Sequence, residues 1–218
     1  MKYKAVIFDL DGTLLDTLFD IVGAVNFALE QTGNDKRYSY EEGKLLIGSG
    51  AYTLARRAYS FKQASEEEFL KFQQLFFDTY LERQGRTTKP FDGIVELLSN
   101  LKSRGIKLCV ASNKPDHLLK IILNEKLPSI AFDVAKGHKP GYKEKPDPRI
   151  VNEIKQNLLL NDDECLYIGD SHTDIETAKN ANIDICLVTY GYEKYTDELK
   201  EKATYVASSV DDIAKLLL

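Results

Sequence analysis

The stretch Ala5-Val6-Ile7-Phe8-Asp9-Leu10-Asp11-Gly12-Thr13-Leu14-Leu15-Asp16 decides the fold of this chain. Its continuous apolar run at residues 6–8 is typical of a strand that is buried on both faces of a parallel sheet. Two carboxylates follow where the strand ends, and open α/β sheets bind their ligands beyond the carboxyl ends of the strands. We therefore expect Asp9 and Asp11 to lie close together at a crevice, with Gly12 allowing a tight turn after them.

Two neighbouring carboxylates repel each other, and a bound cation would relieve that repulsion. A small number of hard oxygen ligands suits Mg²⁺, which commonly shares its coordination shell with a substrate phosphate. One carboxylate could then attack the substrate while the other transfers a proton. The alternative interpretation is an acidic turn that only caps the strand.

Composition narrows the class of protein. The chain has 218 residues, 43% of them hydrophobic, which fits a single core with an inserted subdomain. A formal charge of -5 and a pI near 5.4 argue against a nucleic-acid or membrane-surface binder. No apolar run approaches the roughly 20 residues of a membrane span. Residues 1–4 lead directly into a strand, so we expect no signal peptide there. Cys109, Cys165 and Cys186 are widely spaced in apolar runs, which is typical of reduced thiols, so we expect a cytoplasmic protein.

The periodicity of the sequence changes once along the chain. Residues 17–84 show helical spacing, with capping boxes at Ser39/Glu42 and Ser65/Glu68 and a turn expected at 47–50. A linker is expected at 85–90. Beyond it helices and strands alternate, with strands expected at 106–112, 132–135, 165–170, 183–188 and 205–206 and helices at 93–104, 116–124, after 148, at 174–180 and from 210.

This alternation predicts a doubly wound parallel α/β sheet, a Rossmann-like core, with an inserted all-helical cap. The expected division is a core of residues 1–16 and 88–218 and a cap of residues 17–87. An insertion at the carboxyl edge of the first strand would hang over Asp9 and Asp11, where it could exclude water as a lid.

Polar side chains follow further strands or lie in adjoining loops: Ser112 with Asn113, Lys145, and Asp170 with Asp174. Phosphoryl transfer needs a nucleophile, cations and hydrogen-bond donors for the phosphate oxygens, and this set offers each of them. Each residue alone has a structural alternative, since helix caps, turns and solvated loop lysines use the same residue types. All of them in this order favour a phosphate site.

The same motifs resemble those of haloacid dehalogenase-like superfamily hydrolases: Asp9-Leu10-Asp11-Gly12-Thr13, Ser112, Lys145 and Gly169-Asp170-Ser171-His172-Thr173-Asp174. The resemblance spans the whole length. It implies that Asp9 is the nucleophile, that an aspartyl-phosphate forms on it, and that Asp11 is the general acid and base. It also implies Mg²⁺ held by Asp9, the backbone carbonyl of Asp11 and Asp170, with Asp174 supporting the metal site. The same resemblance implies that the phosphate is bound by Gly12, Thr13, Ser112, Asn113 and Lys145.

Within that superfamily, residues 16–20 and 47–58 are similar to segments of phosphoglycolate phosphatases. The resemblance implies a small phosphorylated metabolite as substrate, and we expect a monomer or a homodimer. Arg56 or Arg57 could reach a substrate carboxylate, and the alternative is that this helical pair is surface charge. Dehalogenases lack the second aspartate of the first motif, so Asp11 favours phosphate chemistry. The alternatives are a β-phosphoglucomutase-like phosphomutase, an inorganic pyrophosphatase and a non-catalytic binding protein. The usual hinge histidine of that mutase is replaced here by Phe19 and Asp20.

Overall fold

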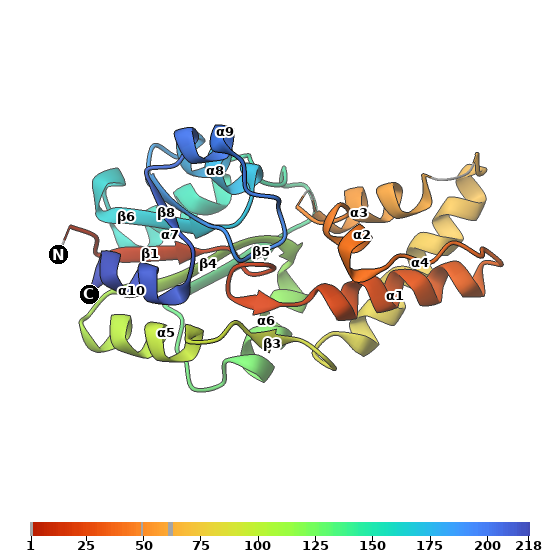
Figure 1. Ribbon diagram of the computed structural model, residues 1–218, viewed down its shortest axis with the longest axis horizontal. Helices are drawn as coiled ribbons and strands as arrows, with labels where there is room; N and C mark the ends of the chain where they lie inside the picture. The colour runs from red at the N-terminus through yellow and green to blue at the C-terminus, as the bar shows by residue number, and fades with distance from the viewer. Residues whose placement is uncertain (1, 49, 61–62) are drawn as a thin grey trace.

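A parallel sheet forms the centre of the structure, a computed structural model that describes residues 2–48, 50–60 and 63–218. Within those residues the sheet has six strands in the order β5-β4-β1-β6-β7-β8 (Figure 1). Their bounds are Ala5–Phe8 (β1), Lys107–Pro115 (β4), Val134–His138 (β5), Cys165–Gly169 (β6), Asp184–Val188 (β7) and Tyr205–Ala207 (β8). Every neighbouring pair is parallel, which confirms the predicted α/β fold class.

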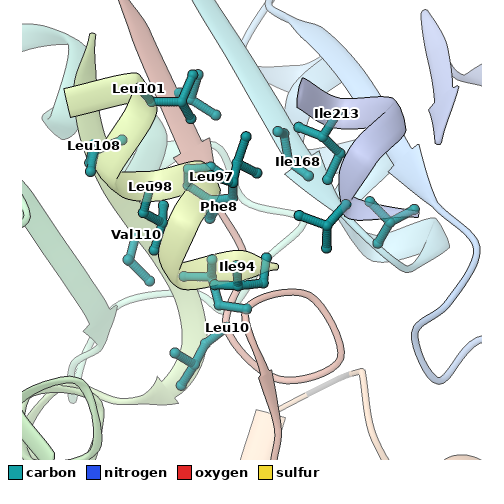
Figure 2. Packing of buried hydrophobic residues seen from close by; sticks show 14 of the residues in the cluster. Phe8, Leu10, Ile94, Leu97, Leu98, Leu101, Leu108, Val110, Ile168 and Ile213 are labelled. Carbon is teal, nitrogen blue, oxygen red and sulfur yellow. The ribbon is translucent and has the colours of Figure 1, made fainter. Parts of the chain in front are cut away.

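Helices cover both faces of the sheet. The side chains of β1 point alternately to the two faces of the sheet. Val6 and Phe8 therefore belong to one buried cluster, and Ala5 and Ile7 belong to another. The first face carries α5 (Ile94–Ser103), α6 (Asp116–Lys126) and α10 (Val210–Leu217), and the second carries α7 (Arg149–Leu158), α8 (His172–Asn180) and α9 (Asp197–Lys202). Figure 2 shows the first cluster, in which Phe8 packs with Leu97 and Leu98 of α5. Burial of each such side chain stabilises the fold by about 1.5–3 kcal/mol.

A helical segment extends beyond the carboxyl edge of the sheet (Figure 1). It comprises α1 (Leu18–Gln31), α2 (Tyr40–Lys44), α3 (Gly50–Tyr59) and α4 (Glu66–Arg83). Both predicted capping boxes are present, at the N-termini of α2 and α4. The segment has its own apolar core, in which α4 contributes an aromatic stripe of Phe69, Phe72, Phe76 and Tyr80. The expected turn at 47–50 includes Ser49, which lies outside the described residues.

A two-stranded ribbon joins the helical segment to the sheet. Leu15–Asp16 (β2) pairs antiparallel with Lys89–Pro90 (β3), and the sequence did not predict it because each strand has only two residues. The carboxylate of Asp20, in the first turn of α1, accepts hydrogen bonds from the backbone N–H groups of Gly85, Thr87 and Thr88 and from both threonine hydroxyls. The predicted linker is therefore fastened to α1.

Several element bounds differ from the expected ones. Strand β4 continues to Pro115 instead of ending at 112, because it pairs with β5 again beyond an irregularity. Strand β5 begins at Val134 and not at 132, since the Asp133 carboxylate is engaged by Lys102 and the Leu108 N–H. Helix α8 begins at His172, and α9 was not predicted. None of the helices in the described residues is long and apolar enough to cross a membrane.

Candidate active site

The predicted site residues meet at the carboxyl edge of the sheet. Asp9 and Asp11 follow β1, Ser112 and Asn113 lie in the last part of β4, and Asp170 follows β6. Together with Lys145 they line a cavity of about 780 Å³ whose opposite wall comes from the helical segment. The structure thus places side chains that are far apart in the sequence around one cavity.

Two carboxylates that line this cavity, those of Asp9 and Asp170, lie close to a third, that of the fully buried Asp174. Oxygen atoms of Asp9, Asp170 and Asp174 all lie within 4.8 Å of one another. Burial raises the pKa of Asp9 to about 7, and burial together with the neighbouring Asp174 raises the pKa of Asp170 well above its ordinary value. Without a divalent cation, this cluster opposes its own ionisation.

Lys145 is the internal cation of the cluster. Its Nζ lies 2.9 Å from Asp9 Oδ1 and 2.8 Å from Asp174 Oδ1, and it donates to the Tyr167 hydroxyl at 2.9 Å. Burial alone would lower the pKa of Lys145, but the Asp174 and Asp9 carboxylates raise it well above its ordinary value. One lysine thus offsets part of the charge of three carboxylates.

Asn113 positions the backbone of Lys145. Its Oδ1 accepts a hydrogen bond from the Lys145 N–H at 2.6 Å, and its Nδ2 donates to the Lys145 carbonyl at 3.2 Å. Ser112 is 2% exposed, and its Oγ accepts a hydrogen bond from the N–H of Lys114 at 3.2 Å. The side-chain amide of Asn113 is therefore engaged by the protein, whereas the Ser112 hydroxyl still has a proton to donate.

The arrangement of donors fits a hard divalent cation. Lys145 Nζ lies near Asp9 Oδ1, but its direction is outside hydrogen-bond geometry, so within the described residues this buried oxygen accepts no hydrogen bond. The oxygens of Asp174 are occupied differently: Oδ1 contacts Lys145, and Oδ2 accepts from the N–H and hydroxyl of Ser171. Asp9 and Asp170 also line the cavity, whereas Asp174 is fully buried behind them, so Asp9 and Asp170 are the better-placed ligands.

The Asp170 carboxylate sits in a cradle of glycines. A Cβ added to Gly12 would lie 2.4 Å from Asp170 Oδ2, and one added to Gly191 would lie 2.3 Å from its Cβ. Gly12 also has a positive φ of 87°, which disfavours other residues. Asp170 Oδ2 accepts from the backbone N–H of Tyr192 at 2.7 Å, and Oδ1 accepts from the Thr13 hydroxyl at 3.3 Å. Gly12 and Thr13 thus shape the pocket around a candidate metal ligand.

Asp11 has partners that sequence reasoning missed. Its Oδ1 accepts from the Thr17 hydroxyl at 2.7 Å and lies 3.2 Å from the ammonium of Lys114, which also donates to the Tyr80 hydroxyl of α4. Lys114 is 5% exposed, and although burial lowers its pKa, Asp11 and Tyr80 raise it above its ordinary value. The sequence offered one indication of the role of Lys114, because this lysine stands two residues after Ser112, at a strand end that carries candidate site residues.

The structure does not bring Arg56 to the cavity. Its guanidinium makes two hydrogen bonds with Glu66, at 2.6 and 3.0 Å, and lies 3.6 Å from the centre of the Phe69 ring on the outer side of α3. The neighbouring Arg57 does line the cavity and donates to the Ile47 carbonyl at 3.3 Å. Successive helical residues point about 100° apart, so one of the pair faces the site and the other does not.

These features define a class of protein. The haloacid dehalogenase-like hydrolase family matches residues 6–188, and the chain belongs to that family. It is a phosphoric monoester hydrolase that acts on a small phosphorylated substrate, as its similarity to several phosphatases indicates.

Three relatives illustrate the similarity. The chain is 35% identical over 189 residues to a phosphoglycolate phosphatase of Caulobacter vibrioides, covering 86% of this chain and 79% of that protein. It is 33% identical over 214 residues to the phosphoglycolate phosphatase of Aquifex aeolicus, with 98% and 96% covered. A crystal structure of a predicted phosphoglycolate phosphatase from Haemophilus somnus superposes with a TM-score of 0.91 at 28% identity, covering 100% and 99% of the two chains.

Proposed function

We propose that this protein is a Mg²⁺-dependent phosphatase that hydrolyses a small phosphomonoester, phosphoglycolate in the first place, through an aspartyl-phosphate on Asp9. The observation that carries the proposal is the cluster of Asp9, Asp170 and Asp174, two of whose members, Asp9 and Asp174, pair with the buried Lys145. One buried oxygen of Asp9 accepts no hydrogen bond within the described residues, so the ionised Asp9 carboxylate is a suitable nucleophile.

In the first step an oxygen of Asp9 attacks phosphorus, and the bond from phosphorus to the ester oxygen breaks. The departing oxygen takes a proton from Asp11, which stands two residues further along the same strand end. The Ser112 hydroxyl donates a hydrogen bond to a phosphoryl oxygen, while Lys145 balances the charge. Bound Mg²⁺, held by Asp9, Asp170 and the backbone carbonyl of Asp11, would favour the ionised carboxylates and neutralise phosphoryl oxygens.

In the second step Asp11, now a carboxylate, takes a proton from a water molecule that attacks phosphorus. The bond between phosphorus and Asp9 breaks, which regenerates the carboxylate and releases inorganic phosphate. Asp174 takes no proton in this scheme and holds Lys145 in place. Residues 17–87 act as a cap that shields the cavity from water, and the three buried thiols support a cytoplasmic location.

The substrate proposal rests on Arg57 and on the named relatives. Phosphoglycolate carries a carboxylate next to its phosphate, and a guanidinium on the cavity wall opposite Lys145 can bind it. A generic aryl phosphate lacks that carboxylate. Arg57 should therefore contribute to hydrolysis of one substrate and not of the other.

A pair of variants tests this assignment. Arg57→Gln should lower kcat/KM for phosphoglycolate by about 10²-fold while changing aryl phosphate hydrolysis by less than about threefold. Arg56→Gln, whose parent side chain lies outside the cavity, is the matched control and should leave both activities unchanged. Equal losses of Arg57→Gln on both substrates would contradict the substrate proposal. A higher kcat/KM for another ester in a panel of metabolite phosphates would replace phosphoglycolate without affecting the proposed chemistry.

A further inference from the structure

Tyr192 touches the candidate cation site through its backbone. It lies in the loop that follows β7 and is 6% exposed. Its N–H donates to Asp170 Oδ2 at 2.7 Å, and this is the shorter of the two hydrogen bonds described for that carboxylate. The position of this backbone segment therefore depends on how Asp170 is held.

The hydroxyl of the same residue lies beneath the N-terminus of α1. It accepts hydrogen bonds from the N–H groups of Thr17 at 2.6 Å and Leu18 at 3.1 Å, and it donates to Asp16 Oδ1 at 3.0 Å. These three bonds use the full capacity of a phenol. The first N–H groups of a helix have no partner within the helix, and the Thr17 hydroxyl, directed at Asp11, does not supply one. Tyr192 thus caps a helix that belongs to the other part of the molecule.

The ring between these two ends is firmly packed. It contacts Leu18 and Val22 of α1 in one small apolar cluster. A Cβ added to Gly12 would lie only 2.9 Å from Cδ2 of the ring, so the ring rests directly on the turn after β1. A tyrosine side chain has two rotatable bonds, and both are fixed by this packing. Displacement of the Tyr192 backbone is therefore transmitted to its hydroxyl.

We propose that Tyr192 is a positioning residue that couples the Asp170 end of the cation site to the hinge of the helical segment at Asp16–Leu18. The inference rests on the proposed function, since it requires a divalent ion at Asp170. A bound ion would add a further bond to Asp170, which would hold the Tyr192 N–H and, through the ring, the hydroxyl beneath the first turn of α1 more firmly. Without the ion, Asp170 is held by its hydrogen bonds to Tyr192 and Thr13 against the repulsion of Asp9 and Asp174, and this support is weaker.

Amide hydrogen exchange of the full chain, with and without MgCl₂, tests the coupling. In the wild-type protein Mg²⁺ should slow exchange at Thr17 and Leu18 by about tenfold more than at α10, which reports global stability. In Tyr192→Phe this additional protection should disappear, while the ring and the N–H to Asp170 remain. Tyr40→Phe is the matched control, because the Tyr40 hydroxyl also donates to Asp16, at 3.4 Å, but among the described residues it accepts no hydrogen bond from an N–H group of α1.

The outcomes separate the coupling from the function. If Mg²⁺ does not raise the melting temperature of the wild-type protein, the cation site itself is wrong. If Mg²⁺ binds but Thr17 and Leu18 respond no more than α10, the coupling is overturned and the phosphatase proposal stands. This wild-type comparison decides the matter even if Tyr192→Phe folds poorly. An intact response in a folded Tyr192→Phe protein, equal to that of Tyr40→Phe, also overturns it.

Discussion

Replacing Lys145 by methionine tests whether this lysine neutralises the carboxylate cluster. The substitution keeps most of the side-chain volume and removes the positive charge, so any loss of stability reports mainly the electrostatic role of Lys145. Lys145 is 3% exposed at its side chain and stands within 3 Å of oxygens on Asp9 and Asp174. Both carboxylates would remain buried without their cation.

The size of the effect follows from this burial. Removing one partner of a buried ion pair costs about 3–5 kcal/mol, because the remaining charge has lost both water and its partner. For a chain of this length that corresponds to a fall in melting temperature of roughly 6–20 °C without metal. The fall should be smaller at pH 5 than at pH 8, since the carboxyl groups of the folded variant can take up protons at low pH. Added Mg²⁺ should restore part of the stability by supplying a replacement cation.

Urea unfolding at both pH values, with EDTA or with MgCl₂, measures these quantities. Lys155→Met is the matched control, because Lys155 is also a largely buried lysine but pairs with the half-exposed Asp162. It should lose less stability and show no recovery with Mg²⁺. A loss in Lys145→Met below about 1 kcal/mol, independent of pH and metal, would refute the role given to Lys145.

Three further changes have defined outcomes. Asp170→Asn should abolish the rise in melting temperature that Mg²⁺ causes. It should also stabilise the metal-free protein at pH 8, since it removes one of three crowded charges. An unchanged Mg²⁺ response would exclude Asp170 as a ligand. The urea midpoint of the metal-free wild-type protein should fall as the pH rises from about 4 to about 7. The pKa of Asp9 is about 7 in the folded protein and 3.8 ordinarily, so over this range the folded state retains a proton that the unfolded chain has released. Saturating Mg²⁺ should flatten that slope, and a rise in stability over the same range without metal would contradict the assigned pKa. Asp20→Ala should lower stability by about 2–4 kcal/mol and expose residues 85–88 to proteases, because five hydrogen bonds are lost; intact protease resistance would show that the linker is held by other contacts.

Sequence reasoning succeeded where one residue pattern determines one local structure. The apolar run of β1 followed by Asp9 predicted a buried strand with an acidic end, and Ser39 and Ser65 with their glutamates predicted helix starts that the structure contains. Spacing alone also separated the helical segment from the sheet. In these cases the determining contacts lie within a few residues.

Contacts between distant residues explain what was missed. The ribbon of β2 and β3 is too short to leave a pattern, and it forms because residues 15 and 90 are brought together by the fold. The position of Lys114 near Ser112 places it at the candidate site, but Tyr80, which contacts its ammonium together with Asp11, comes from a distant helix that no local pattern indicates. The choice between Arg56 and Arg57 depended on how α3 is rotated, which adjacent positions in a sequence cannot reveal.

Trapping the covalent intermediate tests the central claim most directly. Acid quenching during turnover with Mg²⁺, followed by mass spectrometry of the peptides, should find one phosphoryl group on Asp9, and Asp9→Asn should be folded, inactive and unlabelled. Phosphoryl transfer to another residue, or turnover retained by Asp9→Asn, would contradict the account.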